Sequence, residues 1–222
     1  MRKSEHAISI AKAASNLIPF VGGPISSLIG DYLLTTTQKA IDQTLEYLKE
    51  RVESLEERLD SDVVDKDEFV ELFKSCYLII VRTHQEAKLR GAANLLANMF
   101  LKSGDGEKMD YTEIDHFVRC LESLSIGSVK ILGQANKLAK MSNRQAATTT
   151  PTRITFEELN KEVLPMAPSL LMGLIGELNA FNLLHIPGAP AIREPGYQNY
   201  SIEIPPLGRR FVEYVLGEVD QK

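Results

Sequence analysis

The chain has few of the residues that mark secreted, metal-binding or nucleic-acid-binding proteins. Its 222 residues include two cysteines and four histidines, and the formal net charge is -5. Such a charge gives no long-range attraction to nucleic acid or to an anionic bilayer. Cys76 and Cys120 lie in apolar helical patterns and match no metal spacing, so we expect two buried free thiols in a reducing cytosol.

The sequence also lacks a secretory signal and a set of metal ligands. Glu5 and Lys12 interrupt the apolar run after the basic start, and no convincing Ala-x-Ala cleavage site follows, so we expect a cytoplasmic protein. The stretch 60–71 has the length of a calcium-binding loop, but Val64 and Asp65 stand at its fifth and sixth positions, and the sixth requires glycine. The histidines show no ligand spacing; they are His6, His84, His116 and His185.

One group of carboxylates crowds a glycine-rich connector. Such a group could seat a cation or act as acid and base, although a solvated loop is the commoner explanation. Its members are Asp105, Glu107, Asp110, Glu113 and Asp115. Gly22 and Gly23 are no phosphate-binding loop, because the Lys and Ser/Thr that complete one are missing. We therefore predict no catalytic residue, no metal and no cofactor, in a protein that is not an enzyme.

A segment near the N-terminus is uncharged from Ala13 to Gly30. Pro19 and Pro24 flank two glycines there, which favours a helix, a hinge and a second helix over one straight helix. The piece after Pro24 is only about 11 residues long, too short to span a bilayer. Packing in the core or at an interface is favoured over conditional membrane contact or another partner. The candidate contact residues are Leu17, Ile18, Phe20, Val21, Ile25, Leu28 and Ile29.

The cleanest helical period in the chain runs from Gln38 to about Asp60. Apolar residues recur there at intervals of four and three, the spacing of a coiled-coil seam. They are Ile41, Leu45, Leu48, Val52, Leu55 and Leu59. The same stripe would serve equally as an interface between two chains or as one wall of a bundle within one chain. We expect Thr35, Thr36 and Thr37 to cap the start of this helix.

The remaining patterns predict a mainly α protein with two domains. Further helices are expected at 68–82, from a capping box at 83–86 to Phe100, at 111–124 and at 126–141, with Ser125 as a cap. Together these form an all-α bundle over residues 1–141. Residues 142–153 have no apolar period and several threonines, which is typical of a linker.

The last domain, 154–222, shows a different pattern. Thr155 caps a short helix, a longer helix follows over 169–184, two short strands are expected at 191–193 and 200–204, and Pro206 starts a final helix. Helix, helix, β-hairpin and helix is the order of a winged helix. The closing run from Tyr200, with Pro-Leu-Gly-Arg-Arg-Phe after a strand, resembles the end of winged-helix domains.

The charges of this domain argue against DNA binding. Residues 169–184, where a recognition helix would lie, contain no Lys or Arg, and residues 151–222 hold six basic against nine acidic side chains. Reading base edges and releasing counterions both need cations on one face. We therefore favour a winged helix that docks proteins or dimerises, with a DNA-binding transcriptional regulator as the alternative.

The helix 86–100, with its Ala-Asn-Leu-Leu-Ala-Asn run, and the helix 114–125 that ends in Leu-Ser after a short loop resemble the bacterial Abi-alpha family, which is associated with abortive infection. The resemblance covers about 40 residues and carries no catalytic residue. It implies an all-α, non-enzymatic effector of phage defence. We expect its partner to be a protein or a second copy of itself, in a homo-oligomer, with membrane contact on activation and without nucleic acid.

Overall fold

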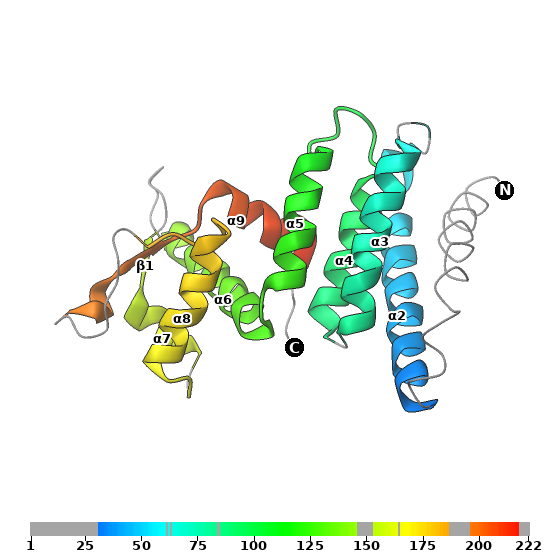
Figure 1. Ribbon diagram of the computed structural model, residues 1–222. Coiled ribbons are helices and arrows are strands. Elements are labelled where there is room, and N and C mark those ends of the chain that lie inside the picture. The colour runs from blue at the N-terminus through cyan, green and yellow to red at the C-terminus, as the bar shows by residue number, and fades with distance from the viewer. Residues whose placement is uncertain are drawn as a thin grey trace. The chain divides into compact units, whose positions relative to one another are not determined.

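The computed structural model describes residues 31–60, 62, 64–83, 85–145, 153–163, 165–186 and 196–217 (Figure 1). Over these residues the protein is mainly helical, with eight α-helices and one small antiparallel sheet, and the predicted mainly α class is confirmed. Two predicted features, the hinge segment that holds Leu17 to Ile29 and the strand 191–193, lie outside the described residues.

The chain divides into two units, Met1–Glu122 and Ser123–Lys222. This boundary lies earlier than the linker expected at 142–153, and it assigns helix α6 (Ile126–Gln145) to the second unit, not to the first. The physical reason is packing, because α6 contacts helices α7 (Phe156–Glu162) and α8 (Pro168–Ala180) of its own unit. An apolar helical period identifies a face to be buried but not its partner.

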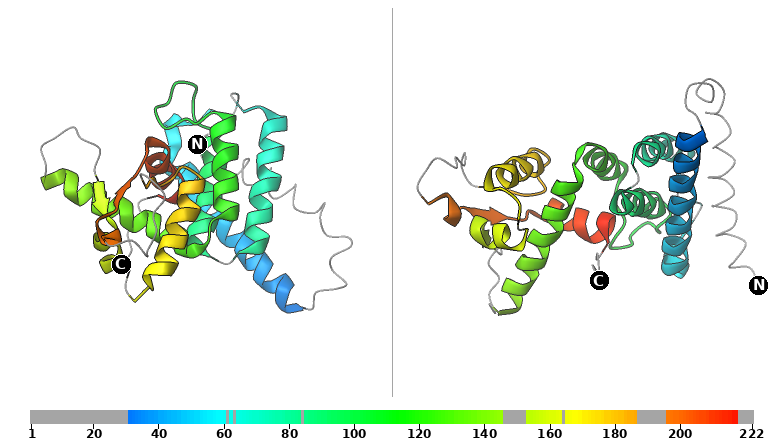
Figure 2. Two further views of the ribbon diagram at one scale, coloured as in Figure 1. Left: turned by 60° about the vertical axis from the view of Figure 1, so that its left-hand side comes forward. Right: turned by 90° about the horizontal axis from the view of Figure 1, so that it is seen from below.

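Unit 1 contains four helices that alternate in direction: α2 (Asp31–Leu55), α3 (Lys66–Arg82), α4 (Glu86–Asn98) and α5 (Tyr111–Ser123), the last of which ends one residue past the boundary (Figure 1). α2 packs against α4 and α3, and α3 also packs against α4. Figure 2 shows α2 running obliquely across its neighbours. A short 3-10 helix, η2 (Glu56–Arg58), continues α2.

The apolar stripe of α2 lies in this bundle. Ile41, Leu48, Val52 and Leu55 are buried within the single chain, whereas Leu45 and Leu59 are half-buried. Packing of α2 on α4 and α3 therefore accounts for most of the stripe without a second chain.

Two predictions about helix ends in unit 1 are wrong. α2 does not begin after the threonines but at Asp31, so it passes through Thr35 to Thr37. The modest penalty of β-branched residues does not stop a helix that is stabilised elsewhere along its length. The capping box at 83–86 is not formed either. Thr83 ends α3, and α4 begins after Gln85, whose side chain makes no capping hydrogen bond.

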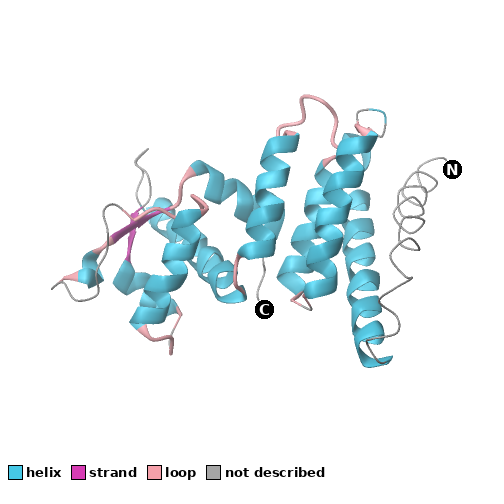
Figure 3. Ribbon diagram, viewed as in Figure 1, coloured by secondary structure: helices cyan, strands magenta, loops and turns pink. Residues whose placement is uncertain are grey.

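Unit 2 combines four α-helices with a two-stranded sheet (Figure 3). Strand β1 (Arg153–Thr155) precedes α7 and pairs antiparallel with β2 (Ser201–Glu203), with Ile154 opposite Ile202. On the other side of β2, His185 and Glu203 exchange two backbone hydrogen bonds of 2.8 and 2.9 Å. The unit closes with η4 (Tyr197–Asn199), α9 (Pro206–Arg210) and the π-helix η5 (Phe211–Leu216).

The predicted strand at 200–204 is present as β2, but its partner in the described residues was missed. β1 is three residues long, too short for the alternation that identifies a strand from sequence. The predicted Thr155 cap is confirmed, because its hydroxyl accepts a hydrogen bond from the Glu158 amide and the Glu158 carboxylate accepts one from the Thr155 amide. This capping box fixes the direction in which α7 leaves β1.

Gly208 in α9 marks a close backbone approach in unit 2. A β-carbon placed there would lie 2.1 Å from the carbonyl oxygen of Leu183, on the chain that follows α8. Because that neighbour is backbone, no side-chain rotation relieves the overlap. A β-carbon placed on Gly133 in α6, by contrast, would have no neighbouring atom within 4 Å beyond the adjacent residues and the backbone of its own helix.

We predict opposite effects for alanine at these two glycines. Gly208→Ala should lower the free energy of unfolding by roughly 2 kcal/mol or more, because α9 must move away from residue 183. Gly133→Ala should raise it by about 0.5–1 kcal/mol, since alanine is the better helix former. Urea unfolding followed by circular dichroism measures both. Equal effects of the two substitutions would contradict the close approach.

Candidate functional site

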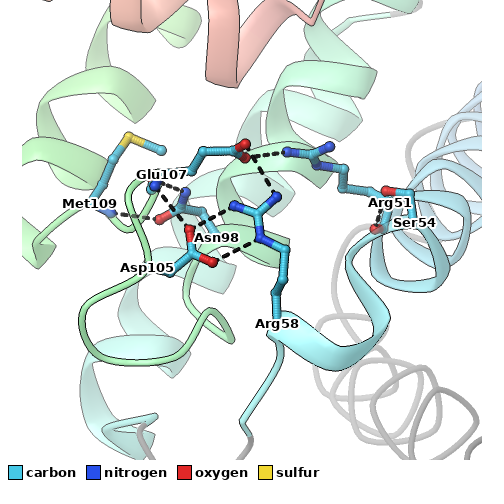
Figure 4. Close-up of polar contacts among 7 residues, drawn as sticks. All are labelled: Arg51, Ser54, Arg58, Asn98, Asp105, Glu107 and Met109. Carbon is cyan, nitrogen blue, oxygen red and sulfur yellow. Dashed lines mark hydrogen bonds and ion pairs between the residues drawn. The ribbon is translucent and has the colours of Figure 1, made fainter.

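Two of the carboxylates singled out by the sequence, Asp105 and Glu107, meet one arginine of α2 and one of η2 (Figure 4). Arg58 donates to Asp105 through Nη2 and Nε, at 2.6 and 2.8 Å, in a two-pronged contact. Its Nη1 donates to Glu107 Oε1 at 3.2 Å, and Arg51 Nη2 donates to Glu107 Oε2 at 3.1 Å. We call these four residues the arginine–carboxylate cluster.

Helical spacing and a backbone contact bring the cluster together. Arg51 and Arg58 are seven residues apart, about two helical turns, so they project from the same side of α2 and η2. The connector that carries the carboxylates is held beside them by backbone hydrogen bonds. The Asp60 amide donates to the backbone carbonyl of Phe100 at 2.8 Å, and the Lys102 amide donates to the backbone carbonyl of Arg58 at 2.9 Å.

Asn98 and Lys108 shape the connector from its inner side. Asn98 is 5% exposed, and its amide group donates to the Glu107 carbonyl at 2.8 Å while its oxygen accepts from the Met109 amide at 2.9 Å. Lys108 Nζ donates to the Met99 carbonyl at 2.6 Å, next to the C-terminus of α4, where a cation is favoured. Burial lowers the pKa of Lys108.

The contacts of the cluster hold the Asp105 carboxylate ionised. Hydrogen bonds from Arg58, and then one from the Glu107 amide, lower the pKa of Asp105 to about 2. Hydrogen bonds to Asp105 and Glu107 raise the pKa of Arg58. A general acid or base works best with a pKa near the operating pH. The lowered pKa of Asp105 therefore suits an ion pair with Arg58 and does not suit proton transfer. The cluster fastens the connector to α2.

Two of the remaining carboxylates of the predicted group, Asp110 and Asp115, have separate roles. Asp110 accepts a hydrogen bond from the Glu113 amide at 2.8 Å, at the start of α5, and Asp115 pairs with Arg119 one turn along that helix. The structure therefore divides the predicted group. Among the described residues, no three His, Cys, Asp or Glu side chains lie together in a way that could hold a metal ion.

Cys120 has a histidine neighbour that the sequence did not reveal. His116 Nε2 lies 3.5 Å from its sulfur, one turn earlier on α5. The cysteine is nevertheless fully buried, and burial raises the pKa of its thiol to about 12. Burial does the same for Cys76. Thiols of this kind stay protonated and are inert, so both cysteines contribute to packing, as expected.

A second polar group joins two helices of unit 2. Glu177 of α8 accepts hydrogen bonds from the Ser125 amide at 2.7 Å and from the Ser128 hydroxyl at 2.6 Å. The Ser125 hydroxyl accepts from the Ser128 amide at 3.1 Å, which confirms Ser125 as the predicted cap of α6. Glu177 is the one charged residue of α8, and its carboxylate is bound by two serines of the same unit. Sequence reasoning missed the group because its members are about 50 positions apart.

Comparison of the chain with models of protein families, with curated proteins and with solved structures finds no match. Each helix that the structure describes is either too short or too polar to serve as a membrane-spanning segment.

We predict that Asp105→Asn lowers the free energy of unfolding at pH 7 by about 1–2 kcal/mol, because it removes a charge-assisted, two-pronged contact. Asp115→Asn is the matched control and should cost no more than about 0.5 kcal/mol, as expected of a surface pair within one helix. Urea unfolding of both variants measures the difference.

The same variant should change how stability depends on pH. A carboxylate whose pKa is lowered from 3.8 to about 2 stabilises the folded state in its charged form. Its contribution is complete above about pH 4 and is lost as the pH falls toward 2. The stability difference between wild type and Asp105→Asn should therefore shrink over that window. A difference that stays constant down to pH 2 would contradict the ion pair.

Proposed function

We propose that this protein is a non-enzymatic interaction protein, an effector of the bacterial defence type that acts through its apolar N-terminal segment. The observation that carries the proposal is the arginine–carboxylate cluster. The carboxylates that the sequence offers for acid–base chemistry instead hold a connector in place, with Asp105 bound by Arg58 at 2.6 and 2.8 Å. We therefore propose that the protein acts through apolar surface.

The resemblance to the Abi-alpha family supports a shared scaffold. The two resembling stretches correspond to α4 and α5, and their apolar residues lie in the core of unit 1. Leu89, Ala92, Ala93 and Phe117, for example, are at most 1% exposed. Residues that only pack preserve a fold and leave function to other parts of the chain.

For unit 2 we propose a winged-helix arrangement that docks a protein. In its support, the order is helix, strand, helix, helix and strand, and β2 has β1 on one side and His185 on the other. α8 would then hold the place of the recognition helix. Its exposed side carries Leu170, Gly173 and Gly176 and no basic residue, which suits a protein surface better than a phosphate backbone.

We predict that the wild-type protein floats with liposomes on a density gradient and that Leu28→Glu abolishes this. A buried carboxylate costs several kcal/mol in an apolar environment, so the variant should lose most of its membrane-bound fraction. Ser103→Glu, which adds the same charge at an exposed position of unit 1, is the matched control and should float like wild type. Absence of lipid association for all three, at every lipid composition and pH tested, would remove the membrane-effector proposal.

A mobility-shift assay tests the alternative, a DNA-binding regulator. With no cation on α8, we expect no shift of mixed duplex DNA at about 0.15 M salt, and weak, sequence-independent binding at most at low salt. Binding that weakens about tenfold on Arg209→Ala, but is unchanged by Lys66→Ala in unit 1, would favour a regulator instead.

A further inference from the structure

One side of α3 is apolar and partly uncovered. Leu72, Cys76, Ile79 and Ile80 face the bundle and are buried. A quarter-turn away lies a second row of half-buried side chains, and beyond it lies Leu78, which is 46% exposed. The row consists of Val70, Phe73, Tyr77 and Val81. We call this row together with Leu78 the α3 face.

The α3 face differs from an ordinary solvent-facing surface. Positions 70, 73, 77 and 81 follow the three- and four-residue spacing by which one helix packs against another. The charged residues between the row and Leu78 are Lys74 and, nearer the start of the helix, Asp67. Among the described residues of unit 1, Leu78 is the one large hydrophobic side chain that is exposed. A single exposed leucine is common, but one that extends a half-buried apolar row points to a missing partner.

The uncharged segment of the same chain ends at Gly30, directly before the start of α2. α3 and α2 run in opposite directions, so the start of α2 at Asp31 lies near the end of α3, as the views of Figures 1 and 2 agree. Leu78 is one turn from the end of α3. Helix lengths and the usual spacing of packed helices put it about 20 Å from the start of α2.

Chain length permits the contact. Phe20 precedes Asp31 by eleven residues, which can extend to about 35 Å, well beyond the distance required. Gly22, Gly23 and Pro24 supply residues suited to a reversal of the chain between Phe20 and α2. Residues 13–30 contain no charged side chain. Packing them against the α3 face would therefore not bury an unpaired charge from this segment.

From this we infer that residues 17–29 dock on the α3 face in the resting protein, as an internal cover that must leave before the segment can contact a membrane. The inference rests on the proposed function only in this last step. The docking itself is a claim about one chain without lipid.

Disulfide trapping tests the docking directly. In the full chain, Phe20→Cys with Leu78→Cys should form an intramolecular disulfide under mild oxidation, identified as a joined peptide pair by mass spectrometry. The matched control joins Phe20→Cys to Asp62→Cys, an exposed position four residues before the start of α3, and should not react. Cys76 and Cys120 can remain, because both are fully buried. No joined pair for Leu78, or a pair formed only between two chains, overturns the inference.

Proteolysis provides a second measurement that needs no cysteine. Leu78→Glu should release the segment and increase cleavage within residues 17–29 by at least about tenfold, since cleavage follows the population of the open form. Leu170→Glu, which alters the exposed leucine of unit 2, is the control and should leave that rate unchanged. Equal cleavage rates in wild type and Leu78→Glu overturn the docking.

Flotation with liposomes separates this inference from the proposed function. Increased flotation of Leu78→Glu supports both. A disulfide between positions 20 and 78 without lipid binding by any variant supports the docking and removes the membrane effector. Lipid binding by wild type with no disulfide and no change in cleavage retains the effector and overturns the docking.

Discussion

The burial of the apolar stripe on α2 is the constraint on which unit 1 depends. A 25-residue helix with most of its apolar residues in one row has little stability alone, so it needs a surface to pack against. α4 supplies that surface with alanines and leucines that are at most 2% exposed, such as Ala93 and Leu96. Small residues on α4 let the two helices approach closely, and α3 completes the contact.

The arginine–carboxylate cluster secures this packing at one end. A connector with two glycines costs conformational entropy to order, and Gly104 adopts a left-handed backbone conformation with φ of 90°. Arg58, Asn98 and Lys108 offset that cost by binding carboxylates and backbone carbonyls of the same connector. The position at which α5 starts therefore follows from how α2 ends.

A common theme links this cluster to the group around Glu177. In both, charged side chains that could have marked a reactive site are bound to groups of the protein itself. The large hydrophobic side chains exposed in the described part of the chain are Leu78 on α3, Met141 on α6 and Leu170 on α8. That contrast is why the proposals concern contacts with apolar partners.

By itself the sequence determined the helical class, the apolar stripe of α2, the approximate limits of α3, α5 and α6, and the caps at Ser125 and Thr155. These are local properties, set by side chains three or four positions apart or by a cap and its own helix. Only the tertiary structure decided that α6 belongs to unit 2, that Arg58 binds Asp105, that Glu177 reaches Ser125, and that a three-residue strand pairs with β2. Each of these joins residues tens of positions apart, and no local pattern specifies which distant partner a side chain or strand will meet.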